Sequence, residues 1–275
     1  MIPVNRSDKI IKLKLDIIFK RVFGDSNNKE IISAFLEALL EMPRNSIQDI
    51  IIENVELPPN ELDKKFSRLD LKMLVDNKIV NIEMQVNYEA DFKDRTLFYW
   101  SKIYSDELGS GDEYGELKKT VCINIINFNA LKNQSYHSHF ISAEKETGEI
   151  LSDKFDIHFF KLKKIKNSAR NKPMEDWLNL INAETEGELM DIETNTQIKE
   201  VRDTIVILRE LNADDKLKQE VYYREKRLHD EASALGSARR EGIAEGEAKK
   251  EAELIERWRK KGFSEKQIKE LLGDD

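Results

Sequence analysis

Three residues with oxygen donors, Asp70, Glu83 and Gln85, interrupt the apolar stretch SRLDLKMLVDNKIVNIEMQVNY. The Asp76-Asn77 pair in its middle is typical of a tight turn between two strands. In a hairpin folded about this turn, Asp70 lies close to Glu83 on the neighbouring strand. Two facing carboxylates repel each other, and a buried carboxylate is costly without a cation. The sequence therefore predicts a cation beside this acidic pair.

That cation is either a side chain or a metal ion, and the spacing alone leaves both open. Lys72 lies on the same strand face as Asp70, so it could neutralise both acids at a sheet edge. Alternatively, oxygen donors without clustered histidine or cysteine favour Mg²⁺, with Mn²⁺ as a substitute, over zinc. With so few protein ligands, Mg²⁺ keeps water and takes further oxygens from a phosphate, which is the composition of a phosphodiester-cleaving site.

Apolar periodicity predicts the elements that position these residues. Steps of three and four indicate helices in LKLDIIFKRVFG, which Gly24 ends as a C-cap, and in NKEIISAFLEALLEM, which Pro43 ends. After the strand pair, a third helix carries Phe92, Thr96, Tyr99 and Ile103 on one stripe. Further on, LKKTVCINIINF and FDIHFFKLKKI read as strands, and PMEDWLNLIN reads as a helix with proline in its first turn. These elements predict an α/β core with a mixed central sheet flanked by helices.

Beyond residue 186 the composition becomes helical and charged. We expect a core domain over residues 1–185 and an all-helical C-terminal arm over 186–275. In the arm, small residues recur at steps of four in two rows: Ala234, Ala238, Gly242 and Gly246, and Ala244, Ala248 and Ala252. Each interior glycine costs a helix about 1 kcal/mol relative to alanine, which favours a partner helix on this face and hence a homodimer. The alternative is a solvated linker helix.

Composition limits the class of protein. The formal net charge of −8 argues against generic, salt-driven adhesion to nucleic acid or anionic membranes. The lone Cys122 lies in an apolar run and is expected to be a buried, inert thiol. The N-terminus lacks a signal-peptide pattern and no run is long enough to span a membrane, so we expect a cytoplasmic protein.

Two further motifs bear on binding. His137 and His139 have a spacing that would suit a metal on a strand, but without a third histidine or cysteine in support they are predicted to lie on a surface loop. The basic run KLKKIKNSARNK, residues 161–172, is either a local contact for a DNA backbone or a solvated strand end. We favour the DNA contact, because a chain with this negative net charge would need local attraction if the acidic pair were a DNA-cleaving site.

In combination these segments resemble the PD-(D/E)XK nuclease superfamily, and more narrowly the recombination-promoting nucleases known as PD-(D/E)XK nuclease-family transposases. The match rests on LDIIFKRVFG, SRLDLKML, NIEMQ, DRTLFYWSKIY, the strand TVCINIINF, the helix start PMEDWL and the glycine-containing tail. The resemblance covers most of the chain and implies a restriction-endonuclease-like core.

The resemblance also implies roles at the site. Asp70 and Glu83 would bind the metal, the Met84 carbonyl would be a further ligand, and Asp16 on the first helix an outer one. Gln85 stands where the superfamily more often has lysine, and its amide can orient water but cannot accept a proton. Proton removal would then fall to metal-bound hydroxide, a substrate phosphate or Lys72.

Phosphate contacts would come from the polar pair on the third helix, Arg95 and Tyr99, with Lys72 and Lys20 beside them. Two of these residues have plainer interpretations. Tyr99 also suits core packing in the aromatic stripe, and Lys20 also suits an ion pair with Asp16 four positions earlier.

The function implied is a Mg²⁺-dependent DNA endonuclease linked to recombination or mobile elements. The alternative is a nuclease-like scaffold of weak or no activity that acts as an interaction module through its arm. Choice of RNA over DNA is left open, because no residue in these motifs reads a 2′-hydroxyl.

Overall fold

The structure, a computed structural model, describes residues 5–6, 8–53, 71–165 and 171–272. Its strands are β1 (Ile50–Glu53), β2 (Leu71–Val75), β3 (Lys78–Gln85), β4 (Thr120–Ile126), β5 (His137–Ala143) and β6 (Ile150–Lys161). Its α-helices are α1 (Asp16–Phe23), α2 (Lys29–Leu39), α3 (Phe92–Ser105), α4 (Lys172–Asn182), α5 (Glu186–Asn195), α6 (Lys199–Ala213), α7 (Asp215–Lys260) and α8 (Glu265–Leu272).

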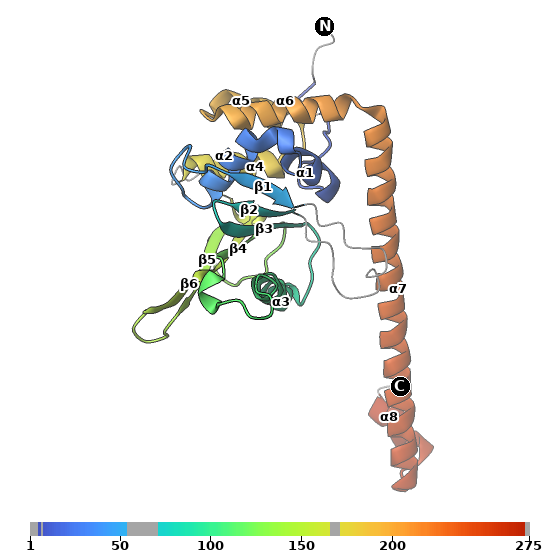
Figure 1. The fold of residues 1–275 in the computed structure, drawn as a ribbon. Coiled ribbons are helices and arrows are strands. Elements are labelled where there is room, and N and C mark those ends of the chain that lie inside the picture. Colours follow the sequence, from blue (N-terminus) through green and yellow to red (C-terminus); the bar gives the residue numbers. More distant parts are fainter. Residues whose placement is uncertain (1–4, 7, 54–70, 166–170, 273–275) are drawn as a thin grey trace. The chain divides into compact units, whose positions relative to one another are not determined.

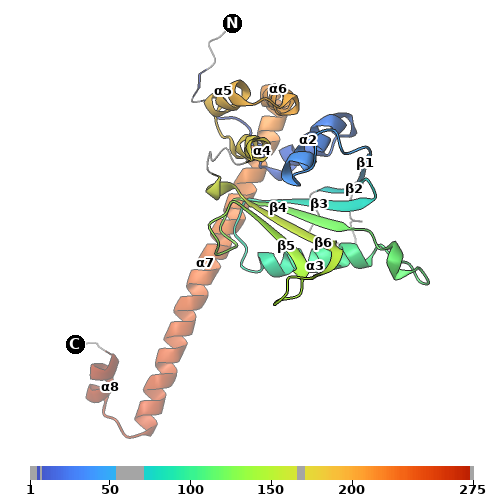
Figure 2. The same cartoon turned by 90° about the vertical axis from the view of Figure 1, so that its left-hand side faces the viewer.

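The strands form one mixed sheet in the order β1-β2-β3-β4-β6-β5. The pairs β3–β4 and β4–β6 are parallel, and the other neighbours are antiparallel. Helices cover both faces, with α2 and α4 on one side and α3 on the other (Figures 1 and 2). The predicted α/β core with a mixed, helix-flanked sheet is confirmed.

The β2–β3 hairpin turns where the sequence predicts. Asp76 and Asn77 both have positive φ, 43° and 65°, which is the conformation that a two-residue type I′ turn requires. The Asp76 carboxylate also accepts hydrogen bonds from the backbone N–H groups of Gln48 and Asp49. The register pairs Lys72 with Asn81, as expected for a fold about this turn. Asp70 lies outside the described residues, so its predicted pairing with Glu83 stays a prediction.

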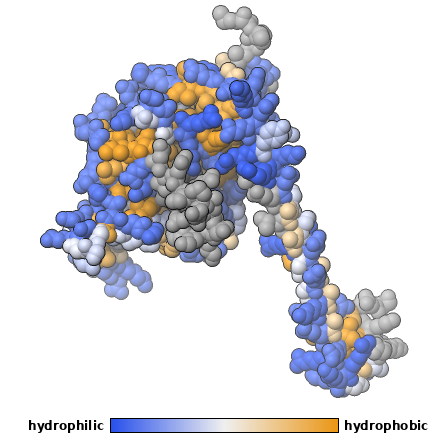
Figure 3. Space-filling model, turned by 45° about the vertical axis from the view of Figure 1, so that its right-hand side comes forward, coloured by the Kyte–Doolittle hydropathy of each residue, from blue (hydrophilic) through white to orange (hydrophobic). Residues whose placement is uncertain are grey.

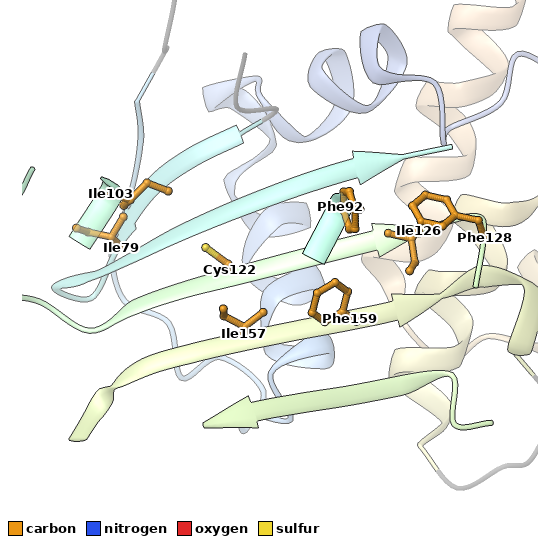
Figure 4. Packing of buried hydrophobic residues seen from close by; sticks show 8 residues of the cluster. All are labelled: Ile79, Phe92, Ile103, Cys122, Ile126, Phe128, Ile157 and Phe159. Carbon is orange, nitrogen blue, oxygen red and sulfur yellow. The ribbon is translucent and has the colours of Figure 1, made fainter. Parts of the chain in front are cut away.

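The hydrophobic core lies on both faces of β4, every residue of which is buried. On one face, α3 buries the predicted stripe of Phe92, Thr96, Tyr99 and Ile103. Figure 4 shows part of this layer, in which the side chains of β3, β4 and β6 meet Phe92 and Ile103. A strand that is covered on both sides needs a continuous apolar sequence, which explains the run in TVCINIINF.

Aromatic rings fill the opposite face. Phe23 packs on Phe35 with ring centroids 4.5 Å apart, and Trp177 of α4 lies 5.4 Å from Phe35. Gly24 ends α1 as predicted, but in a right-handed conformation at φ −93°. A Cβ there would lie 2.5 Å from the Lys20 carbonyl oxygen and 3.1 Å from the Leu71 side chain. Close approach to the Lys20 carbonyl and to β2, rather than a left-handed cap, therefore requires this glycine.

The prediction that His137 and His139 lie on a surface loop is wrong. Both belong to β5, the edge strand, which pairs antiparallel with β6. The strand has the sequence HSHFISA, and most of its residues are exposed or half-buried. Without an apolar face of its own, β5 gives a weak strand signal, and its pairing with β6 decides its conformation.

The chain divides into two compact units, Met1–Asp215 and Lys216–Asp275. Helices α5 and α6 belong to the first unit, where α6 packs on α2 and α4. The second consists of α7 and α8, and α7 is mostly hydrophilic (Figure 3). A capping box begins α8, with Ser264 and Gln267 each accepting a hydrogen bond from the other's backbone N–H. Within the described ranges, no helix is both long and apolar enough to cross a membrane.

A capping box also begins α5, and its removal gives a testable cost. The Thr185 hydroxyl accepts from the Glu188 N–H, and the Glu188 carboxylate accepts from the Thr185 N–H. We expect Thr185→Ala to lower the free energy of unfolding by about 1 kcal/mol, measured by urea denaturation. The control is Thr194→Ala within the same helix, where the exposed hydroxyl only bonds the Met190 carbonyl. Equal losses in both variants would rule out a capping role.

Candidate active site

Glu83 lies near the carboxyl end of β3, on the face that α3 covers. Its neighbour across the parallel pair is Asn124 of β4, whose side chain accepts a hydrogen bond from Thr96 of α3. Only 8% of the Glu83 side chain is exposed. A carboxylate so deeply buried needs a cation or several hydrogen bonds to stay charged.

Arg95 of α3 supplies that cation. Its Nη2 atom lies 2.7 Å from Glu83 Oε1 and 3.3 Å from Gln85 Oε1, and its Nη1 contacts Glu89 Oε2. Gln85 in turn donates to Glu89 Oε1 at 2.9 Å. The four side chains form one network, in which a planar guanidinium fork holds two carboxylates and an amide.

Packing fixes the position of Arg95. Its guanidinium carbon lies 4.9 Å from the centre of the Phe92 ring and 5.9 Å from that of Tyr99. Both rings are buried, so Tyr99 packs in the core stripe and also contacts the cation. Among the described residues, no group accepts a hydrogen bond from the buried Arg95 Nε. The Nε–H donor of the guanidinium thus remains for a further acceptor.

Lys72 points to a different acid. Its ammonium lies 2.9 Å from Glu53 of β1, and its strand partner is Asn81. The sequence offered a lysine or a metal ion as the cation for Glu83, and the side-chain cation beside it is an arginine, not Lys72. Arg95 was predicted from the sequence to contact a phosphate group of the substrate, and the contact of Arg95 with Glu83 was missed. The twelve-residue separation of the two gives no local signal for that contact.

The remaining predicted ligands come from two elements. Met84 follows Glu83 on β3, and its side chain is buried on the opposite face of the sheet. Asp16 is the first residue of α1 and is half-buried, and Lys20 lies one turn later on the same helix. Asp70 lies outside the described residues. The structure therefore brings Glu83, Gln85 and Arg95 together in one network.

Two other sequence predictions concern the surroundings of the site. Cys122 is buried as expected, and burial, followed by the charge of Glu83, raises the pKa of its thiol so far that it stays neutral. Lys161 begins the basic run but is itself buried, and it donates to the Asn133 carbonyl at 3.1 Å. Burial lowers the pKa of Lys161, with a smaller effect from Lys164. This lysine therefore supports the loop at Asn133 and is not a surface contact for DNA.

A second cluster of titratable groups lies on the other face of the sheet. His139, Asp156 and His158 bring their ligand atoms within 4.8 Å of one another, among the described residues. Burial, together with His158 and His139, lowers the pKa of the adjoining His137 to about 4. Burial alone would raise the pKa of Asp156, but His158 and Lys119 bring it well below its usual range. His158, which lies in the strand segment DIHFF, was not included in the sequence predictions. Only the pairing of β5 with β6 brings His158 close to His137 and His139.

Comparison with known families adds the decisive observation. The family model described as PD-(D/E)XK nuclease family transposase matches residues 13–238. The chain belongs to this family. No curated protein and no solved structure gives a match. As a member of the PD-(D/E)XK nuclease family transposases, the chain has a restriction-endonuclease-like fold and carries a nuclease domain of a class that acts on DNA and is tied to mobile elements.

Proposed function

We propose that this family member is a cytoplasmic, divalent-metal-dependent DNA endonuclease that hydrolyses phosphodiester bonds during recombination or mobile-element activity. The observation that carries the proposal is the buried Glu83 carboxylate, two residues before Gln85 on β3 and held by an arginine from the next helix. A buried acid of this kind in a nuclease family is a candidate metal ligand.

The donor set suits Mg²⁺ or Mn²⁺. Glu83 offers a carboxylate, Gln85 an amide oxygen and Met84 a backbone carbonyl, and these are hard oxygen ligands. Asp70 is proposed as the second acidic ligand and Asp16 as an outer one. When bound, such an ion polarises the phosphoryl oxygen and makes an adjacent water more acidic.

The side chains have separate roles in the proposed reaction. Gln85 orients the attacking water, because its amide can donate and accept but cannot take up a proton. Arg95 holds Glu83 in place through its hydrogen bond and offers its planar fork to the scissile phosphate. Tyr99, Lys72 and Lys20 are proposed as further phosphate contacts along the bound strand.

Cleavage of supercoiled plasmid tests the proposal. We expect nicked or linear product with Mg²⁺ or Mn²⁺, no product with EDTA, and loss of product in Asp70→Ala and in Glu83→Ala. A second candidate, a scaffold without activity, is favoured by the pairing of Glu83 with Arg95, which satisfies its charge without a metal. Absence of product with both metals, or cleavage that survives in both variants, would support the scaffold.

We propose that the chain dimerises through the small residues of α7, so that two sites act on two strands. Gly242 and Gly246 are exposed, and a Cβ at either would meet no described atom within 4 Å. Light scattering after size exclusion is expected to give twice the mass of the chain, and Gly242→Gln with Gly246→Gln is expected to halve it. Glutamine is the better helix former, so the substitutions block close helix approach without weakening the helix.

The matched control is Lys249→Gln, an exposed position on the same helix outside both small-residue rows. It is expected to leave the mass unchanged. A wild-type monomer, or a glutamine variant that stays dimeric, would contradict dimerisation through this face.

A further inference from the structure

We propose that His139, Asp156 and His158 form a binding site for a transition-metal ion of the Zn²⁺ class, separate from the Glu83 network. The site joins the edge strand β5 to β6. Two imidazole nitrogens and one carboxylate oxygen suit Zn²⁺ and its neighbours, whereas Mg²⁺ takes oxygen ligands. The two sites would therefore select different metals.

Strand pairing creates the cluster. The antiparallel register places His139 directly opposite His158, and Asp156 lies two residues earlier on β6. All three side chains therefore project from one face of the sheet. The rings of His139 and His158 are stacked, with centroids 4.1 Å apart, so their ring nitrogens lie close to each other. Both imidazoles place Nε2 near a single oxygen, Oδ1 of Asp156, and His139 Nε2 is hydrogen-bonded to it.

His158 carries the observation that points to an ion. The residue is only 5% exposed, and among the described groups its buried Nε2 has no hydrogen-bond partner. Its nearest acidic atom, Asp156 Oδ1, lies 3.1 Å away, within ion-pair distance. Bonds of about 2.0–2.1 Å in a tetrahedral zinc site put neighbouring ligand atoms about 3.3 Å apart. The separation of this nitrogen and this oxygen is therefore close to that of two ligands of one ion.

The surrounding contacts orient the same three atoms. His137 Nε2 lies 3.0 Å from His158 Nδ1, so His158 can donate its Nδ1–H and keep Nε2 available as a ligand. Lys119 Nζ binds the other oxygen of Asp156, Oδ2, at 2.7 Å. The carboxylate is thus fixed with Oδ1 towards the histidines. Hydrogen bonding of a metal-ligating histidine through its second nitrogen is the usual arrangement in zinc sites.

The cluster lies across the sheet from Glu83. His158 pairs with Ile123 of β4, and Ile123 pairs with Ile82 of β3, so these side chains share one face. Glu83 comes next on β3 and projects to the other face, under α3. The side chain of His139 is 44% exposed, which gives an ion a route in from solvent. Three protein ligands leave a fourth position for water or an external ligand.

Calorimetric titration of the metal-stripped full chain with Zn²⁺ in excess Mg²⁺ tests the site. We expect saturable binding with one ion per chain, and at least a tenfold loss of affinity in His139→Ala, whose exposed position should not affect folding. His158→Asn, checked for native circular dichroism, is expected to lose as much. The matched control is His229→Ala on α7, with unchanged affinity.

A second readout uses Co²⁺, whose visible absorption distinguishes tetrahedral from octahedral coordination. The wild-type chain is expected to show the intense tetrahedral bands, and His139→Ala to lose them. Glu83→Gln is expected to keep both Zn²⁺ binding and the bands, whether or not the chain cleaves DNA. No saturable Zn²⁺ binding, binding that survives in both His139→Ala and His158→Asn, or loss of binding in Glu83→Gln would each overturn the proposal.

Discussion

The Arg95→Met variant is expected to lose about 3 kcal/mol of unfolding free energy, because it removes the arginine that is paired with a buried carboxylate. Arg95 is the group that lies 2.7 Å from Glu83, and the Glu83 side chain has little access to water. Methionine retains the aliphatic bulk beside Phe92 and Tyr99, so the packing of α3 changes little. Urea denaturation followed by circular dichroism measures the loss.

A double variant separates the lost charge pair from lost packing. Combining Arg95→Met with Glu83→Gln is expected to recover most of the stability, because a neutral amide costs far less to bury than a carboxylate. The control is Arg240→Met, an exposed arginine on α7 that bonds Ser237 and should have no measurable effect. If the single and double variants are equally unstable, the stability lost in Arg95→Met does not come from the buried charge of Glu83.

The rate of plasmid cleavage by Glu83→Gln is expected to fall about 10²–10⁴-fold, since a catalytic metal contributes several kcal/mol to the transition state. The isosteric amide can still accept the hydrogen bond from Arg95, so the fold is retained while a charged metal ligand is lost. Initial rates at saturating Mg²⁺ give the comparison.

Glu89→Gln is the matched control for that measurement. Glu89 touches both Arg95 and Gln85 in the same network, but its side chain is 43% exposed and it is not a proposed ligand. We expect less than a tenfold change in rate. Losses of equal size in the two variants would assign the effect to the charge network as a whole and not to Glu83 as a ligand.

Local sequence patterns were sufficient to predict much of the fold. The turn at Asp76-Asn77 follows from two residues that tolerate positive φ. The buried stripe of α3 follows from the 3.6-residue period, and the buried β4 from its continuous apolar run. In each case the residues that decide the conformation are neighbours in the sequence, so a short sequence segment is enough to predict that element.

The contacts between distant residues were not predictable in this way. Arg95 meets Glu83 because α3 packs on the sheet at one particular angle, and nothing within either segment specifies that angle. His139 meets His158 only through the register of β5 on β6, and β5 itself has too few buried apolar residues to be recognised as a strand. Both clusters depend on tertiary packing, which composition and spacing do not encode locally.

The parallel pairing of β4 on both sides has a consequence for how the chain folds. Its partner β6 ends at Lys161, so the middle of the sheet cannot close until translation has passed that residue. The β2–β3 hairpin, by contrast, needs only a two-residue turn and can form while most of the chain is still unsynthesised. We therefore expect refolding in two kinetic phases, with a fast local step and a slower one in which the central strand acquires its second neighbour.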